Sequence, residues 1–557
     1  MTETINKKFN LIDEKWIKVM GSNYRTIEVS IRDIFENAHM YAGLANDTPV
    51  IDFSILRLLL AILVTSVERY DESGSNWNFP VDDPVSAWKE IWDKGNFSMD
   101  RIGRYLDEWH DRFYLFHPQY PFYQVPQMPF DENDDKVHWS INSFDATLLE
   151  SRRKKRLFSM KSENAKGMLK YPDVARSLVA NQSFSDCPMK KQGEKTEDSS
   201  KNHPGWCGRM MPIYASGKNL FETLMLNLVL SRPNADQAET SINNFPVWER
   251  DIPDNRESLA IPFPKDLAGL FTLQSRRVKL LDDGDCVKQY MTTFGEIPNQ
   301  QDGVNYEPMT LFRSGKDINS IGIAGCGGKE SIQAWRLFPF SIKYLDPRDT
   351  GKKTKFIIEK RPLVADWIST LVNYREEIVL PPVFFRTVSI FYGASNGCVN
   401  DICEDEFGIH PEIFSDAEES TLMEIADEVG KIRQIAAKVG TLFDNLLYAE
   451  GTYPVNRGDE RYKKRYDAAV GGYYDLVNDS LLEFILSFSG DDKDLAEWKK
   501  KARRDALEYG RELAVSFGRN AYVGRIKKDK KGNEEVMTAP LALLNYEKGV
   551  KYVYKSE

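Results

Sequence analysis

The last third of the chain has a regular spacing of apolar residues. From Ser415 onward, apolar side chains recur every three or four residues, at positions 422, 425, 429, 432, 436, 439, 442 and 446. This spacing places them on one face of a helix. It predicts a long amphipathic helix.

Residues 462–488 and 495–517 continue this pattern, and short Gly- and Asp-containing breaks separate the segments. Short connections between long helices favour antiparallel neighbours. We therefore expect an all-α bundle over residues 406–557. A fourth helix would have to come from about 536–548, where the pattern is weakest.

Residues 1–405 mix two kinds of pattern. Residues 1–50 have the composition of short strands and turns, residues 51–115 have helical periodicity, and residues 260–360 contain several strand-like runs. This alternation predicts a large mixed α/β (α+β) domain.

The most apolar run is Phe53–Val67, which Arg57 interrupts. A run of this length is too short to cross a bilayer, so it predicts a buried core helix and no membrane partner. Asp52 or Ser54 is the expected N-cap, because short polar side chains accept hydrogen bonds from the first free amides of a helix.

Two adjacent arginines stand in the strand-like run Gly269–Leu280, which reads GLFTLQSRRVKL. Successive strand residues point to opposite faces, so Arg276 and Arg277 should point in opposite directions. Charges at the middle of a strand predict a fixed anionic partner for at least one arginine, either a carboxylate or a phosphate.

Four blocks, in this order along the chain, resemble those of a known family. They are Phe9–Val19 (FNLIDEKWIKV), Phe116–Pro126 (FHPQYPFYQVP), Leu157–Phe184 (opening LFSMK and closing ARSLVANQSF) and the run with the arginine pair. They are similar to blocks of the CasA-type (Cse family) large subunit of type I-E CRISPR Cascade complexes.

The resemblance implies a mixed amino-terminal domain followed by a four-helix bundle, and a cytoplasmic, non-catalytic subunit of an RNA-guided complex. Such a subunit recognises a protospacer-adjacent motif in double-stranded DNA and helps to open the duplex for R-loop formation. The implied partners are the guide RNA end, the Cascade backbone subunits, a small-subunit dimer at the bundle and a recruited helicase–nuclease. The alternatives are a scaffold subunit without DNA contact and a hydrolytic enzyme.

The loop Gly322–Ser331 (GIAGCGGKES) is close to a phosphate-binding loop but does not match it. Its first glycine is one position out of register, and Glu330 stands where a magnesium-binding hydroxyl is required. The resemblance implies instead that Lys329 enters the minor groove of the motif, beside Gly327 and Gly328. The alternative is an exposed loop lysine.

The segment Phe391–Asp401 (FYGASNGCVND) has the composition of a tight hairpin turn. The resemblance implies a wedge that parts the duplex beside the motif. In the family this hairpin usually has a glutamine near its tip. This chain lacks that glutamine, and the tip region contains Asn396, Gly397, Cys398 and Asn400. The alternative is a plain turn.

Two further segments are candidate DNA contacts by resemblance. One contains Phe158, Ser159 and Met160, and it follows a basic run that could attract phosphate. That run consists of Arg153, Lys154, Lys155 and Arg156. The second is a glycine-containing loop within 187–209, where Gly205 and Gly208 are the candidates. Arg276 and Arg277 are possible phosphate contacts.

Composition narrows the classes of protein function that remain. The chain has 557 residues and a net charge of −10, so nucleic-acid contact has to come from local basic patches. Two such patches, Lys499–Arg504 and Arg525–Lys531, should line the outside of the bundle. The six cysteines form no CxxC pair, and the six histidines show no HExxH spacing. We therefore expect reduced thiols, no metal, no cofactor and no Cys–His nucleophile at His203 and Cys207.

Overall fold

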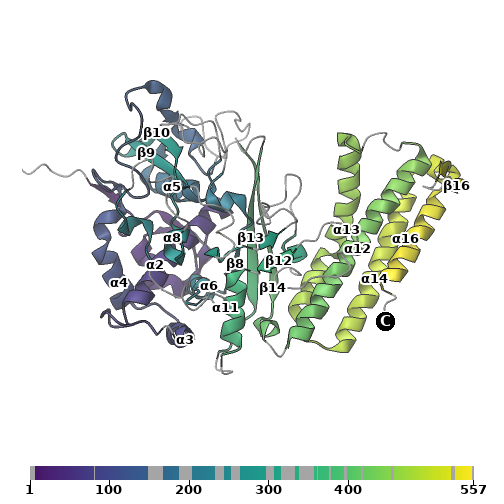
Figure 1. The fold of residues 1–557 in the computed structure, drawn as a ribbon, viewed down its shortest axis with the longest axis horizontal. Coiled ribbons are helices and arrows are strands. Elements are labelled where there is room, and N and C mark those ends of the chain that lie inside the picture. Colours follow the sequence, from purple (N-terminus) through teal and green to yellow (C-terminus); the bar gives the residue numbers. More distant parts are fainter. Residues whose placement is uncertain are drawn as a thin grey trace, which may run out of the picture. The chain divides into compact units, whose positions relative to one another are not determined.

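The computed structural model describes most of the chain. The described residues are 7–80, 82–147, 167–186, 204–231, 244–252, 264–296, 306–310, 312–314, 333–337, 357–360, 362–374, 378–393, 398–415, 418–452, 457–528 and 534–554. They divide into two compact units, with the main division between Glu406 and Phe407 (Figure 1).

The first unit is built around helix α2 (Pro49–Arg69), whose side chains are almost all buried. It packs against α4 (Met99–Glu108), α5 (Tyr171–Phe184) and the short α8 (Leu267–Phe271). The helix extends beyond the run Phe53–Val67 at both ends, so the expectation that it is too short to cross a membrane was wrong. It is long and apolar enough to do so, but 94% of its most apolar window is buried within the protein. It is the predicted core helix.

The predicted N-cap of α2 was wrong. The helix begins with Pro49 at its first turn and Thr48 at the cap position, because proline already has the φ angle that a first turn requires. Asp52 lies inside the first turn and accepts hydrogen bonds from the backbone and side-chain nitrogens of Asn46, at 2.9 and 2.7 Å. Ser54 donates to the carbonyl of Val50 at 2.7 Å.

Helix α3 (Pro84–Lys94) lies in the segment where helical periodicity predicted it, whereas α1 (Ile31–Asn37) lies within residues 1–50, where only short strands and turns were expected. The unit also contains α6 (Leu220–Asn227) and α11 (Leu363–Val372), with short 3-10 turns between several elements.

The described strands of the first unit form small sheets. A three-stranded sheet has the order β3 (Thr26–Val29), β2 (Ile17–Gly21), β4 (Tyr41–Leu44). Another has the order β14 (Val399–Ile409), β13 (Val383–Tyr392), β8 (Ile213–Ser216). A four-stranded sheet joins β6 (Trp139–Ser140), β10 (Cys286–Phe294), β7 (Leu169–Lys170) and β9 (Arg276–Asp282). The two-stranded pairs are β1 (Lys8–Asn10) with β5 (Tyr114–Phe116), and β11 (Phe312–Ser314) with β12 (Ile357–Lys360).

The run Gly269–Leu280 is only partly a strand, which corrects the prediction. Its first residues belong to α8, because the Asp266 side chain caps that helix by accepting from the Gly269 amide at 2.6 Å. Strand β9 begins at Arg276 and pairs antiparallel with β10. The two arginines therefore open the strand and do not lie at its middle.

The described part of the second unit is dominated by four long helices that pack on one another. They are α12 (Glu419–Glu450), α13 (Glu460–Ser487), α14 (Asp492–Val515) and α16 (Ala539–Val553). The eight predicted apolar positions of α12 are all buried. Gly451, with φ 89°, ends α12, and Asp459 and Asp491 cap the next two helices. The weak fourth helix is present.

A hairpin that the sequence did not predict precedes α16. After the short α15 (Arg519–Val523), strand β15 (Arg525–Lys528) pairs with β16 (Glu534–Met537). The basic segment Arg525–Lys531 is therefore partly a strand, and its lysines lie opposite glutamates, which gives favourable cross-strand charge pairs.

Candidate nucleic-acid interface

The sequence-predicted contact residues fall into two groups. Outside the described residues lie Arg153, Lys154, Lys155, Arg156, Phe158, Ser159, Met160, Gly327, Gly328, Lys329, Asn396 and Gly397. Within them lie Gly205, Gly208, Arg276, Arg277, Cys398 and Asn400.

Gly205 and Gly208 flank and occupy a 3-10 turn, η7 (Trp206–Arg209). A Cβ on Gly205 would lie 2.5 Å from the carbonyl oxygen of Ser183. A Cβ on Gly208 would overlap the hydroxyl of Tyr392. Both positions therefore require glycine for close packing within the chain itself, which sequence reasoning did not foresee.

The turn η7 is fixed to the core through Trp206. Its backbone amide donates to Ser275 Oγ at 3.1 Å, and its indole Nε1 donates to Glu307 Oε2 at 2.7 Å. Glu307 is fully buried and pairs with the equally buried Arg57, with Nη1–Oε1 at 2.7 Å and Nη2–Oε2 at 3.2 Å. A charged network inside the core thus holds the turn in place.

Cys207 lies in the same turn and is buried. Burial raises the pKa of its thiol to about 12, although the nearby Arg57 favours the thiolate. The thiol therefore stays protonated at neutral pH, which opposes a nucleophilic role.

The hairpin formed by β13 and β14 comes from the predicted wedge segment. Its strands close at Gly393, whose amide donates to the carbonyl of Cys398 at 2.8 Å. Cys398 and the exposed Asn400 pack over Gly393, where a Cβ would lie 2.5 Å from Cys398 Sγ and 3.1 Å from Asn400 Oδ1. These two predicted residues thus form the base of the hairpin tip.

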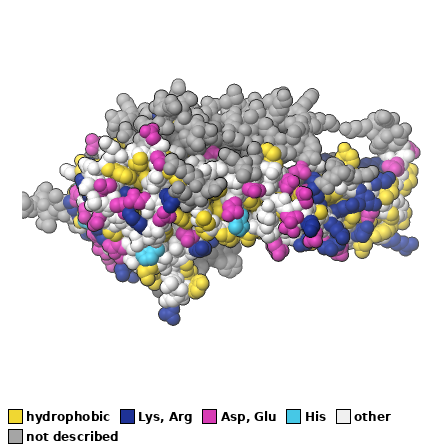
Figure 2. Space-filling view, turned by 90° about the horizontal axis from the view of Figure 1, so that it is seen from below, with side chains coloured by type: hydrophobic (Ala, Val, Ile, Leu, Met, Phe, Trp, Pro, Cys, Tyr) yellow, Lys and Arg dark blue, Asp and Glu magenta, His cyan; other side chains and the backbone are white. Residues whose placement is uncertain are grey.

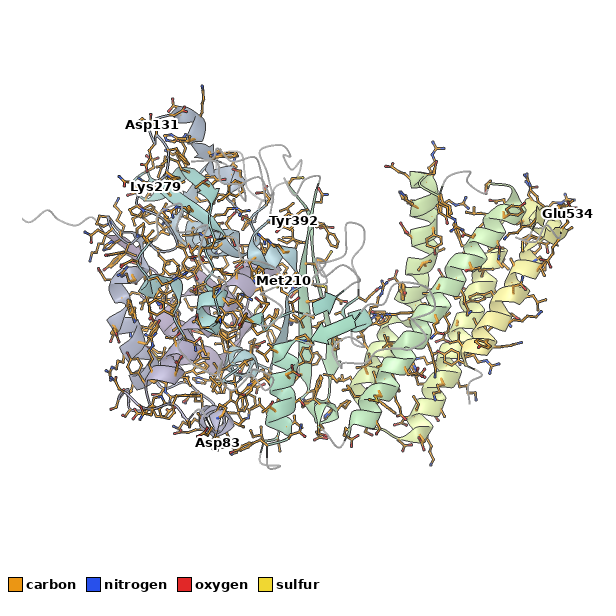
Figure 3. The ribbon with its side chains drawn as sticks, viewed as in Figure 1. Asp83, Asp131, Met210, Lys279, Tyr392 and Glu534 are labelled. Atoms are coloured by element: carbon orange, nitrogen blue, oxygen red, sulfur yellow. The ribbon has the colours of Figure 1, made fainter. Side chains whose placement is uncertain are left out.

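Tyr392 connects this hairpin to the η7 turn. Its hydroxyl donates to the carbonyl of Phe184, the last residue of α5, at 2.6 Å, and it also covers Gly208. Figure 3 labels Tyr392 beside Met210, the residue that follows η7. The structure therefore brings Gly208, Cys398 and Asn400 into one neighbourhood. Sequence reasoning missed Tyr392, and its position after an apolar β-run was the available signal.

Both residues of the arginine pair are buried, with exposed fractions of 2% for Arg276 and 8% for Arg277. The guanidinium of Arg276 donates to the carbonyls of Ser275 and Asp186, at 2.7 and 2.9 Å. Its amide donates to Gln182 Oε1 at 2.9 Å, so α5 and β9 are joined here. Arg276 is therefore built into the fold.

A basic surface lies on α14 of the helical unit. Lys500, Arg503 and Arg504 are exposed, and with Arg511 they line a shallow groove along the helix. Figure 2 shows Lys and Arg side chains gathered over this part of the molecule. The predicted exposed basic face is confirmed, and its charge can attract phosphate.

Groups that could bind a metal ion do not cluster in the part of the chain that the structure describes. There, no three His, Cys, Asp or Glu side chains converge closely enough to hold an ion.

The family model described as CRISPR-associated protein Cse1 matches residues 10–509. The CRISPR-associated protein CasA/Cse1 of Thermus thermophilus is 33% identical over 355 residues. That match spans 62% of this chain and 62% of the relative, which is less than two thirds of the relative's length.

Solved structures share the fold over nearly the whole chain. The crystal structure of Thermobifida fusca Cse1 has a TM-score of 0.75 and 22% identity, and 98% of each chain is covered. A chain in the structure of a CRISPR RNA-guided surveillance complex has a TM-score of 0.66 and 14% identity, with 98% of this chain and 99% of that chain covered.

Proposed function

Because the chain belongs to the CRISPR-associated Cse1 family, we propose that it is the large subunit of an RNA-guided surveillance complex. In this role it reads a short motif in double-stranded DNA, while the guide RNA reads the adjacent sequence by base pairing. Its contribution is binding and duplex opening, without catalysis. Its partners are the guide RNA end, the backbone subunits and a helicase–nuclease that degrades the DNA.

The observation that carries this proposal is the packing of the hairpin base on the η7 turn through Tyr392. A wedge has to resist the force of the base pairs that it separates, since parting a base step costs a few kcal/mol. Here the wedge strand is tied to α5, and the turn beneath it is tied to the buried Arg57–Glu307 pair. The proposal assigns the tip of the wedge to Asn396 and Gly397.

Motif recognition is assigned to the loop with Lys329, Gly327 and Gly328. A single lysine between glycines can approach the minor groove closely, where the base pattern is degenerate, so the recognition is permissive. Phe158, Ser159 and Met160 contact the same region of DNA. The run from Arg153 to Arg156 supplies phosphate attraction.

The helical unit contributes a path for the displaced strand along the basic face of α14 and a docking surface for the small-subunit dimer. Exposed Lys500 and Arg503 provide the positive charge that a single strand requires.

The test is a gel-shift titration of the reconstituted complex with matched and mutated flanking motifs. Lys329→Ala should weaken binding to the matched motif about tenfold or more and leave binding to the mutated motif unchanged. Lys170→Ala, an exposed lysine of the same unit, is the control. If Lys329→Ala and changes at Asn396 and Asn400 leave motif-dependent binding intact, the subunit is a scaffold and the proposal fails.

A further inference from the structure

The hairpin that joins β2 to β3 has a tyrosine at a position that favours glycine. Two backbone hydrogen bonds of 2.9 Å close its turn, from the Gly21 amide to the Arg25 carbonyl and from the Tyr24 amide to the Gly21 carbonyl. Tyr24 follows this turn with a φ angle of 57°, in the left-handed region. Three-residue hairpin loops usually place a glycine there, because a side chain crowds the backbone in that conformation. The tyrosine therefore strains the turn.

The Tyr24 side chain has no stabilising contact that would offset this strain. Its exposed fraction is 85%. It makes no hydrogen bond or ring contact with any residue that the structure describes. A residue that breaks two local rules, one for the backbone and one for apolar exposure, is typical of a functional position. Tyr24 is therefore a candidate contact with another molecule.

Other exposed apolar side chains lie on the same small sheet. Within residues 7–80 and 82–147, the exposed large apolar side chains are Tyr24, Ile27 at 44% and Met40 at 55%. Ile27 belongs to β3, which is the edge strand in the order β3, β2, β4. Met40 directly precedes Tyr41, the first residue of β4, which is paired with Gly21 beside the turn. Met40 and Tyr24 therefore lie at the same end of the sheet, and exposed apolar groups gathered in this way mark interaction surfaces.

Arg25 adds a free cation beside the tyrosine. It is exposed, and its guanidinium makes no ion pair or hydrogen bond with any residue in the described part of the chain. Tyrosine and arginine are among the side chains that contribute most binding energy at protein interfaces, where an apolar centre is surrounded by polar groups. Tyr24 and Arg25 together have this composition.

The charges near this end of the sheet favour a protein over a nucleic acid as the partner. Burial raises the pKa of the Tyr41 hydroxyl, and the nearby carboxylates of Asp33 and Glu36 raise it further. Such negative charge repels a phosphate backbone. The edge strand β3 also exposes Thr26, Ile27 and Glu28, and an open strand edge is a place where another polypeptide can pair.

We propose that Tyr24, Arg25, Ile27 and Met40 form a docking surface for a protein partner. The partner offers an apolar cleft for the ring of Tyr24 and a carboxylate for the guanidinium of Arg25. This inference rests on the proposed function, since the partner is then a neighbouring protein subunit of the surveillance complex. The strained turn holds the ring outward, so little side-chain freedom is lost when it enters the cleft.

The experiment measures the stability of the free full chain and its affinity for the complex assembled without it. Tyr24→Gly should leave the midpoint of urea unfolding unchanged or raise it, because glycine adopts a positive φ angle without strain. The same variant should weaken association about tenfold or more, as measured by biolayer interferometry. A clearly lower midpoint would show that the ring stabilises the chain itself and would overturn the proposal, as would unchanged affinity.

Further variants separate the ring from the backbone. Tyr24→Asn tolerates the left-handed conformation but lacks the ring, so it should lose as much affinity as Tyr24→Gly. Tyr24→Phe keeps the ring and should retain most of the affinity. Arg25→Gln should weaken association about threefold or more. Val379→Ser is the control, because Val379 is 81% exposed in the same unit but lies outside this sheet. An equal loss of affinity in the control would overturn the proposal.

The remaining outcomes identify other partners or a failure of the proposed function. Weaker binding of labelled single-stranded RNA or DNA by Tyr24→Gly would make the surface a nucleic-acid site and overturn the assignment to a protein. A dimer of the free chain that Tyr24→Gly abolishes would make a second copy the partner and would also overturn it. If the parent chain does not associate with the other subunits, the proposed function fails and this inference fails with it. If the parent associates and Tyr24→Gly binds equally well, this inference alone fails.

Discussion

Arg57 and Glu307 form a bidentate ion pair in the core of the first unit, although 250 residues separate them in the chain. Glu307 also accepts from the indole of Trp206 and from the amide of Met309. The Nη2 atom of Arg57 also donates to the carbonyl of Leu270 at 3.1 Å. The buried pair therefore ties α2, η7 and α8 together: Glu307 bonds to Arg57 of α2 and Trp206 of η7, and Arg57 bonds to Leu270 of α8. The candidate interface rests on that junction.

Glu307→Gln should destabilise the first unit by about 3–5 kcal/mol, because it leaves the charge of Arg57 buried without a counter-ion. Urea unfolding followed by far-ultraviolet circular dichroism measures the change. Asp47→Asn is the control, since Asp47 pairs with Lys18 at 2.8 Å on the surface and should cost less than about 1 kcal/mol. Equal losses in both variants would contradict the assigned role of Glu307.

Gly208→Ala should destabilise the protein by about 1–3 kcal/mol, because the new methyl group overlaps the Tyr392 hydroxyl, which Phe184 holds in place. Tyr392→Phe removes that hydroxyl. In a double-mutant cycle, Gly208→Ala should therefore cost less in the Tyr392→Phe background. Gly43→Ala, at a site with open space around it, is the control. Strict additivity would show that the two residues do not meet.

Glu68→Gln should change how stability depends on pH. Burial raises the pKa of the Glu68 carboxyl to about 7, against the opposing effect of the hydrogen bonds from Asn244. Between the ordinary value of 4.5 and about 7, the folded protein holds a proton that the unfolded chain has released. The contribution of Glu68 to the free energy of unfolding therefore falls as pH rises through that window. Below and above the window it does not change with pH.

Glutamine keeps the acceptor for Asn244 and does not titrate. The stability of Glu68→Gln relative to the parent should therefore increase between about pH 4.5 and pH 7, by about 1–3 kcal/mol. Urea unfolding at intervals across this window measures the difference. A difference that stays constant would contradict a raised pKa for this carboxyl.

Replacement of Lys500 and Arg503 by alanine should weaken single-stranded DNA binding by the reconstituted complex. It should also reduce the slope of log affinity against log salt by about 0.7 for each phosphate that is no longer neutralised. Filter binding at several salt concentrations measures both quantities. Lys501→Ala is the control, because Lys501 is exposed on the same helix but does not line the groove. If Lys501→Ala reduces the slope as much as the replacements of Lys500 and Arg503 do, single-stranded DNA does not bind preferentially in the groove.

Some features of this protein follow from the sequence alone. The long helices of the second unit were predicted because a helix of 3.6 residues per turn repeats its buried face locally. The spacing of the apolar positions from Leu422 to Leu446 therefore indicates the first of them. The core helix α2 was predicted from the continuous apolar run Phe53–Val67. The first residue of α2 was not predicted correctly. Thr48 and Pro49 determine the first turn, whereas the expected N-caps, Asp52 and Ser54, lie inside the helix.

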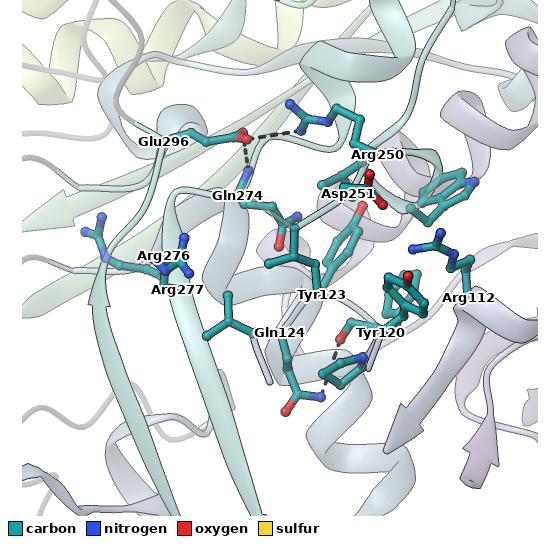
Figure 4. A pocket seen from close by; sticks show the side chains of 16 residues that line it. Arg112, Tyr120, Tyr123, Gln124, Arg250, Asp251, Gln274, Arg276, Arg277 and Glu296 are labelled. Atoms are coloured by element: carbon teal, nitrogen blue, oxygen red, sulfur yellow. Dashed lines mark hydrogen bonds and ion pairs between the residues drawn. The ribbon is translucent and has the colours of Figure 1, made fainter. Parts of the chain in front are cut away.

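Other features were decided only by the tertiary structure. The sequence made Gly208 a candidate by resemblance and drew attention to the arginine pair. It did not show that Tyr392 fills the space at Gly208, or that Asp266 caps a helix where the strand was expected to begin. Arg112 and Arg250 line one pocket (Figure 4) without any local signal in the sequence, because they are more than a hundred residues apart. Periodicity reports which face of an element is buried. The choice of a contact partner depends on how distant elements pack, and local sequence does not encode that.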